Sequence, residues 1–77
     1  MQLGTRWTAG GEPPARLSAE FVAAVRQVEA RYVDAVPQPR WTLTWLEGRP
    51  VAELDDGETV TIVTTDAAGT PVVRTEE

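Results

Sequence analysis

Acidic side chains are the groups in this sequence whose types and spacing could do chemistry. A cluster of carboxylates lies between residues 47 and 58, at Glu47, Glu53, Asp55, Asp56 and Glu58. Carboxylate oxygens are ligands for Ca²⁺ and Mg²⁺, and two neighbouring acids such as Glu53 and Glu58 could share acid–base work. The spacing differs from that of an EF-hand loop, and Asp-Asp-Gly satisfies a hairpin turn by itself. We therefore expect a turn with solvated carboxylates and no bound metal.

The chain contains neither histidine nor cysteine. Nucleophile arrangements of the Ser-His-Asp and Cys-His kinds are thereby excluded, as are zinc sites built from these residues. Gly10-Gly11 lies far from the start of the predicted helix and lacks the lysine of a phosphate-binding loop. We expect a protein that is not an enzyme, binds no cofactor and has no small-molecule substrate.

Two tryptophans near an arginine form the next candidate site. Arg40, Trp41 and Trp45 have the composition of a platform on which nucleic-acid bases stack. The alternation of Trp41, Leu43 and Trp45 with threonines predicts instead a strand that buries both tryptophans. The net charge of −5 also disfavours phosphate binding. We expect these tryptophans in the core, whereas Trp7 is either a cover for the core or an anchor for a partner.

One helix is predicted from Leu17 to Val36. Ser18 is a suitable N-cap, and Pro37 ends the helix because the residue before a proline disfavours the α conformation. At the helical period the sequence forms one apolar stripe, made of Phe21, Ala24, Val25, Val28, Tyr32, Ala35 and Val36. Val22 and Val33 lie on one shoulder of this stripe, on either side of Glu29. The stripe is expected to cover a sheet.

An antiparallel meander of three strands is predicted after the helix. A four-residue loop, Glu47 to Pro50, would place Trp45 opposite Ala52. A three-residue loop, Asp55 to Gly57, would place Ala52 opposite Val60. One face of the sheet then forms the core, with Trp41, Leu43, Trp45, Ala52, Leu54, Val60 and Ile62.

The predicted fold class is α+β, with one amphipathic helix packed on a three- to four-stranded antiparallel meander in the order α-β-β-β(-β). The fourth strand would run from Thr70 to Thr75, and a short N-terminal strand in residues 2–8 is an optional addition. We expect a flexible or extended segment in residues 1–16 and a single domain in residues 17–75. A chain of 77 residues without disulfides is marginally stable alone, which favours association.

Apolar residues outside the predicted core form the candidate partner surface. Its members are Leu46, Val51, Val63, Val22, Val33 and Trp7. The first three gather at one end of the sheet face that the helix leaves open, and the next two form the helix shoulder. Pairing of two copies, by this face or by the open edge of the last strand, would protect both.

These features predict a small acidic, non-catalytic protein-interaction module that forms a homodimer. All seven basic residues are arginine, and lysine and asparagine are absent, as GC-rich codon usage produces. We therefore expect a bacterial or phage origin. A cytoplasmic location is expected, because no apolar run approaches the length of a membrane span and residues 1–16 lack the pattern of a signal peptide.

Two alternative functions remain open. A nucleic-acid-associated regulator could present a sheet face to a groove, which requires its arginines to converge on that face. The arginines concerned are Arg6, Arg16, Arg40, Arg49 and Arg74. The other alternative is an accessory subunit of an enzyme whose active site lies elsewhere.

Overall fold

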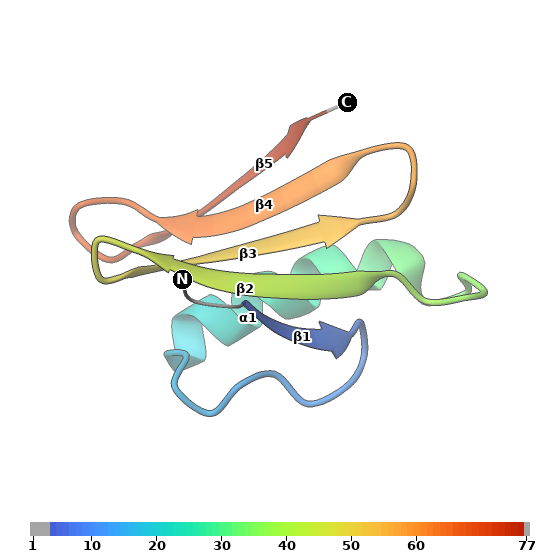
Figure 1. Cartoon of the computed structure of the whole chain (residues 1–77), viewed down its shortest axis with the longest axis horizontal. Helices are drawn as coiled ribbons and strands as arrows, with labels where there is room; N and C mark the ends of the chain where they lie inside the picture. Colours follow the sequence, from blue (N-terminus) through green and yellow to red (C-terminus); the bar gives the residue numbers. More distant parts are fainter. Residues whose placement is uncertain (1–3, 77) are drawn as a thin grey trace.

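A helix packed on one face of a five-stranded antiparallel sheet forms the structure (Figure 1). The computed structural model describes residues 4–76, so the part of the predicted N-terminal strand at residues 2 and 3 lies outside the described residues. The elements are β1 (Thr5–Thr8), α1 (Ala19–Glu29), the 3-10 helix η1 (Ala30–Tyr32), β2 (Arg40–Leu46), β3 (Arg49–Asp55), β4 (Val60–Thr65) and β5 (Pro71–Glu76). The strands lie in the sheet in sequence order. The predicted α+β class is confirmed, with the N-terminal strand and the fourth meander strand both present.

Local signals explain the start of α1 but not its end. Ser18 caps the helix, because its side-chain oxygen accepts a hydrogen bond of 3.1 Å from the Phe21 amide. The prediction that the helix reaches Val36 is wrong. Gln38 folds back and donates hydrogen bonds of 2.7 and 2.9 Å to the carbonyls of Tyr32 and Ala35. Because Gln38 supplies donors to these two carbonyls, no further helical turn is needed to provide them. Val36 consequently lies outside the helix and is 94% exposed.

The β2–β3 hairpin has a shorter loop than predicted. Glu47 and Gly48 form a two-residue loop, with φ of 52° and 80°, which is the geometry that matches strand twist. Trp45 consequently pairs with Pro50 and not with Ala52. Pro50 is tolerated because in such a hairpin its nitrogen points away from β2. The predicted register is therefore wrong by two residues, but an even shift keeps every β2 and β3 side chain on its predicted face.

The β3–β4 register differs from the prediction by an odd number of residues. Asp56 closes a longer loop, since its side chain accepts hydrogen bonds of 2.8 Å from the amides of Glu58 and Thr59. Ala52 pairs with Val63 and not with Val60. The prediction that Val60 and Ile62 lie on the core face is therefore wrong, because an odd shift reverses the two faces of a strand.

The core lies between α1 and the sheet face that it covers, here called the inner face; the opposite face is the outer face. Buried members of this core are Phe21, Val25, Val28, Trp41, Leu43, Ala52, Leu54 and Val63. β1 adds Trp7, which pairs with Trp41 across the strands and stacks on it with ring centroids 5.8 Å apart. Between residues 4 and 76, no helix is long and apolar enough to cross a membrane.

Candidate functional site

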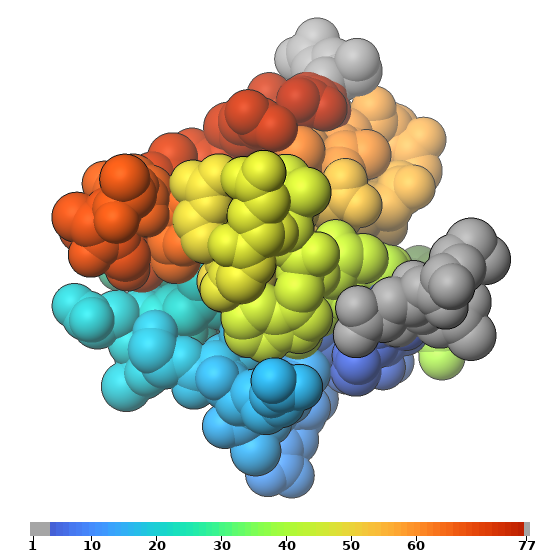
Figure 2. Space-filling view, turned by 60° about the vertical axis from the view of Figure 1, so that its left-hand side comes forward, coloured from blue at the N-terminus to red at the C-terminus, as the bar shows by residue number. Residues whose placement is uncertain are grey.

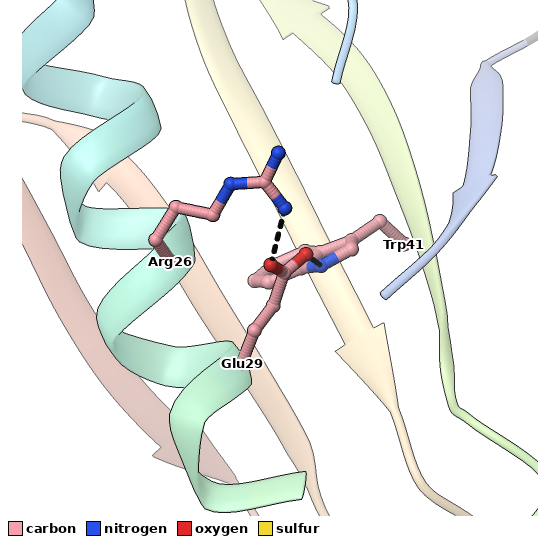
Figure 3. A network of polar contacts seen from close by, with 3 residues as sticks. All are labelled: Arg26, Glu29 and Trp41. Carbon is pink, nitrogen blue, oxygen red and sulfur yellow. Dashed lines mark hydrogen bonds and ion pairs between the residues drawn. The ribbon is translucent and has the colours of Figure 1, made fainter. Parts of the chain in front are cut away.

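A buried polar network joins α1 to the sheet (Figure 3). Glu29 is 8% exposed, and its two oxygens accept hydrogen bonds from Trp41 Nε1, at 2.8 Å, and from Arg26, at 2.7 Å. The sequence analysis placed Glu29 on the helix shoulder without recognising its burial. The predicted burial of Trp41 was the available signal, because a buried indole N–H requires an acceptor. One oxygen of Glu29 thus holds the helix on the sheet through Trp41, while the other pairs with Arg26 within α1.

Two members of the acidic cluster, Asp55 and Asp56, form a hydrogen-bonded turn. The pKa of Asp56 is lowered from its ordinary value of 3.8 to about 2, mainly by hydrogen bonds from the amides of Thr59 and Glu58 and then from the Tyr32 hydroxyl. Asp55 accepts a hydrogen bond of 2.8 Å from the Gly57 amide. Within residues 4–76, no group of three acidic side chains is arranged to hold a metal ion. The side chains of Asp55 and Asp56 therefore serve the backbone of the turn.

The stacking platform, the disfavoured alternative for these tryptophans, does not form. Arg40 and Trp41 are consecutive residues of β2, so their side chains lie on opposite faces of the sheet. Trp41 is fully buried. Trp45 is half-buried, and the guanidinium carbon of Arg16 lies 5.4 Å from its ring centroid. The prediction of core tryptophans is confirmed for Trp41, whereas Trp45 lies at the margin of the core.

The candidate partner surface is only partly assembled. Leu46 is 59% exposed at the end of β2, and Val51 is half-buried on the outer face of β3. Val63, predicted to join them, is fully buried against α1. That assignment is wrong because the odd shift at the Asp56 turn turns Val63 to the inner face.

The other three members of that surface lie elsewhere. Val22 is half-buried on α1, and Val33 is exposed just after η1. Trp7 is half-buried on the inner face, where it stacks on Trp41. Of the two readings left open for Trp7, the structure shows the cover for the core.

Four of the five named arginines share the outer face. The registers place Arg6, Arg40, Arg49 and Arg74 on that face, whereas Arg16 lies over Trp45, whose side chain is on the inner one. Glu53, Asp55 and Glu76 lie among these arginines on the same face. The outer face therefore carries mixed charge and not a continuous basic stripe.

β5 forms the upper rim of the sheet, and no described element lies beyond it (Figure 1). Val72 and Val73, on its two faces, are 42% and 40% exposed. In the space-filling view β5 (red) again lies at the margin, above the protruding tip of the β2–β3 hairpin (yellow; Figure 2). The sequence predicted this strand but not its register, so the free backbone groups could not be assigned.

The turn before β5 shows which of its backbone groups are free. The Asp66 amide donates to the Thr70 carbonyl at 2.9 Å, so this opposed pair is hydrogen-bonded. Hydrogen-bonded and non-hydrogen-bonded pairs alternate along an antiparallel ladder. The backbone groups of Pro71, Val73 and Thr75 therefore point to the open edge, and those of the residues between them point to β4.

Comparison with known proteins finds no matching protein family, no matching curated protein and no matching solved structure.

Proposed function

We propose that this chain is a small, non-catalytic protein-interaction module that forms a homodimer by pairing the β5 strands of two copies. The open edge of β5, six residues long and bearing two exposed valines, is the observation that carries this proposal. An exposed edge strand presents unpaired N–H and C=O groups that template another strand. A bacterial or phage origin and a cytoplasmic location belong to the same proposal.

The free backbone groups favour a two-fold axis at Val73. Val73 of each copy then donates its N–H to the carbonyl of the other, and Thr75 of each copy donates to the carbonyl of Pro71. This arrangement forms about four hydrogen bonds between the copies. Two join the Val73 residues, and each of the two Thr75–Pro71 pairs contributes one, because proline has no N–H to donate. It also buries Val73 against its own symmetry mate, because opposed side chains in such a pair lie on the same face.

Charge disfavours the neighbouring register. An axis at Arg74 would also satisfy the backbone of Val73 and Thr75, but it would place two guanidinium groups directly opposite each other. With the axis at Val73, Arg74 faces Val72 of the other copy and keeps its contact with Glu76, which is 3.7 Å away in the same strand. A dimer built this way is a continuous sheet with both helices on the same side.

Size gives a reason for dimerisation. A 77-residue chain without cysteine has no disulfide to supplement its small core. α1 covers the inner face, while no described element covers the outer face or the rim at β5. Edge pairing provides hydrogen-bond partners for the free backbone groups of β5 in both copies at once. Two-fold dimers are also the commonest oligomers.

Cross-linking with matched cysteine variants tests the proposed axis. Because the chain has no native cysteine, Val73→Cys introduces one thiol per copy. Opposed hydrogen-bonded residues have Cα atoms about 5.5 Å apart, within the range of a disulfide. We expect a covalent dimer of Val73→Cys under mild oxidation, whereas the control Val33→Cys, exposed but remote from β5, stays monomeric in denaturing electrophoresis.

Sedimentation separates the edge from the outer face. Thr75→Pro removes an N–H that points to the open edge, so it should abolish the dimer and leave the β4–β5 pairing intact. Leu46→Asp changes the exposed apolar residue of the outer face and should leave the dimer unchanged. A parent protein that is monomeric at high concentration contradicts self-association, and a dimer lost only in Leu46→Asp transfers the interface to the outer face.

A nucleic-acid-associated regulator is the second candidate, supported by the four arginines on the outer face. The acids between them and the net charge of −5 weigh against it, because each phosphate would also meet a carboxylate. A sequence-independent affinity for oligonucleotides that falls steeply with salt would favour this candidate over the first.

A further inference from the structure

A hollow of about 780 Å³ lies where the outer face meets the loop between η1 and β2. Its sheet side is formed by Arg6, Arg40 and Thr42, and its loop side by Val36, Pro37 and Pro39. This end of the sheet belongs to β1 and β2, on the side away from β5 (Figure 1). The hollow is therefore separate from the proposed dimer edge.

The two arginines of the hollow are neighbours on the outer face. Arg6 pairs with Thr42 across the strands, and Arg40 precedes Thr42 by two positions on β2, so all three side chains share one face. Among the residues that the structure describes, ion pairs within 4.0 Å join Arg26 to Glu29 and Arg74 to Glu76. Arg6 and Arg40 thus have no carboxylate counter-ion in the described part of the chain.

The acids beside the hollow are already engaged. Asp55, which pairs with Arg40 across the strands, accepts from the Gly57 amide. Asp56 accepts from the Tyr32 hydroxyl at 2.9 Å as well as from two amides of its own turn. These hydrogen bonds fix the Asp56 carboxylate and one oxygen of the Asp55 carboxylate on the turn at the border of the hollow. The two arginines thus line the hollow without forming an ion pair within 4.0 Å to any described residue, and Asp55 and Asp56 supply negative charge at its border.

We propose that this hollow binds an oxyanion group, a carboxylate or a phosphate monoester, carried on a short extended peptide. Guanidinium groups bind planar oxyanions through paired, charge-assisted hydrogen bonds. Thr42, opposite Arg6 and on the same face, adds a hydroxyl donor to the lining. Val36, 94% exposed, and Pro37 offer an apolar wall to the side chain next to the anionic one.

The charge distribution favours a peptide over a nucleic acid. Asp55 and Asp56 border the hollow, so successive phosphates of a strand would meet carboxylates after the first contact. A peptide needs only one anionic side chain at the arginines, and a basic neighbour in the peptide would face Asp55. The hollow therefore complements a segment of mixed charge.

Two-dimensional NMR with defined probes tests this proposal. The probes are inorganic phosphate, a blocked tripeptide Val-phosphoserine-Val, its Val-Glu-Val and Val-Ser-Val counterparts, and a thymidine oligonucleotide. We expect saturable shifts of the Arg6 and Arg40 side-chain Nε–H signals with the phosphoserine or glutamate tripeptide, and none with the serine tripeptide. Comparison of these two peptides and free phosphate identifies which oxyanion source is preferred.

Matched arginine variants complete the test. The double variant Arg6→Gln/Arg40→Gln should weaken peptide binding at least tenfold, since it removes two charge-assisted contacts. Arg49→Gln is the control, because it removes one positive charge from the same face outside the hollow. This variant should bind the peptide as tightly as the parent does. Circular dichroism confirms that the variants fold. Equal affinity of parent and double variant, equal shifts at all arginines, or tighter binding of the oligonucleotide than of either anionic peptide would overturn the proposal.

Discussion

Glu29→Ala is expected to lower the free energy of unfolding by about 2–3 kcal/mol. The substitution leaves the Trp41 N–H buried without its acceptor, and a hydrogen bond to a charged group contributes about 1.5–3 kcal/mol. The contact with Arg26, whose side chain is 43% exposed, adds at most about 0.5 kcal/mol. A chain of this length has a total stability of roughly 4–12 kcal/mol, so the loss is a large fraction of the whole.

Urea denaturation at one fixed protein concentration, followed by tryptophan fluorescence and far-UV circular dichroism, measures this loss. Arg26→Ala is the control, because it removes the exposed partner and keeps the buried one. Glu29→Gln retains a carbonyl acceptor for Trp41 without the charge and should cost about 1 kcal/mol. Trp41→Phe in the Glu29→Ala background removes the stranded donor and should recover part of the loss.

A small effect of Glu29→Ala would refute this reasoning. If it destabilises no more than Arg26→Ala, to within about 0.5 kcal/mol, the buried hydrogen bond does not hold α1 on the sheet. The double variant Glu29→Ala/Trp41→Phe gives a second check. If its loss of unfolding free energy equals the sum of the losses in the two single variants, the conclusion is the same, because the losses of coupled partners are not additive.

The remaining predictions concern the core, the turns and the first strand. Trp41→Ala should cost about 3–5 kcal/mol in urea unfolding and Trp45→Ala clearly less, because only Trp41 is fully buried; equal losses would contradict this difference. Gly57→Val should lower the thermal midpoint, because φ is 94° and a branched side chain resists that conformation; an unchanged midpoint would disprove the turn. Gly4→Val should accelerate amide exchange in β1, since an added Cβ would lie 2.9 Å from the Leu43 carbonyl oxygen; parent-like protection would count against this close approach. Asp56 has a folded pKa of about 2 against an ordinary 3.8, so the parent should lose stability as the pH falls from about 4 to 2. Asp56→Asn should show a shallower loss over that range, and a profile identical to the parent's would exclude Asp56 as the titrating group.

Short-range patterns in the sequence were sufficient for several elements. The cap at Ser18 and the alternation around Trp41 depend on residues within one turn or one strand, so they can be read before the fold is known. The class α+β and the open outer face follow from those elements. A turn at Asp-Asp-Gly was likewise predicted from the local pattern, and Gly57 has a φ of 94° in it.

Registers and distant partners required the tertiary structure. Val60 to Val63 are apolar at three positions of four, so either face could be buried, and the hydrogen bonds of Asp56 decide between them. The burial of Glu29 depends on Trp41, twelve residues away, and the pairing of Arg6 with Thr42 depends on the sheet register.

The sequence by itself therefore determined which segments are helix or strand and that the chain lacks histidine and cysteine chemistry. Only the tertiary structure decided which face Val63 occupies, which strand edge stays open and which arginines stand side by side. The physical reason is that helix caps and alternation arise from contacts within a few residues. The face that a side chain occupies, the edge that stays open and the charges that meet depend instead on strand register. A shift of a single residue moves every side chain of a strand to the opposite face.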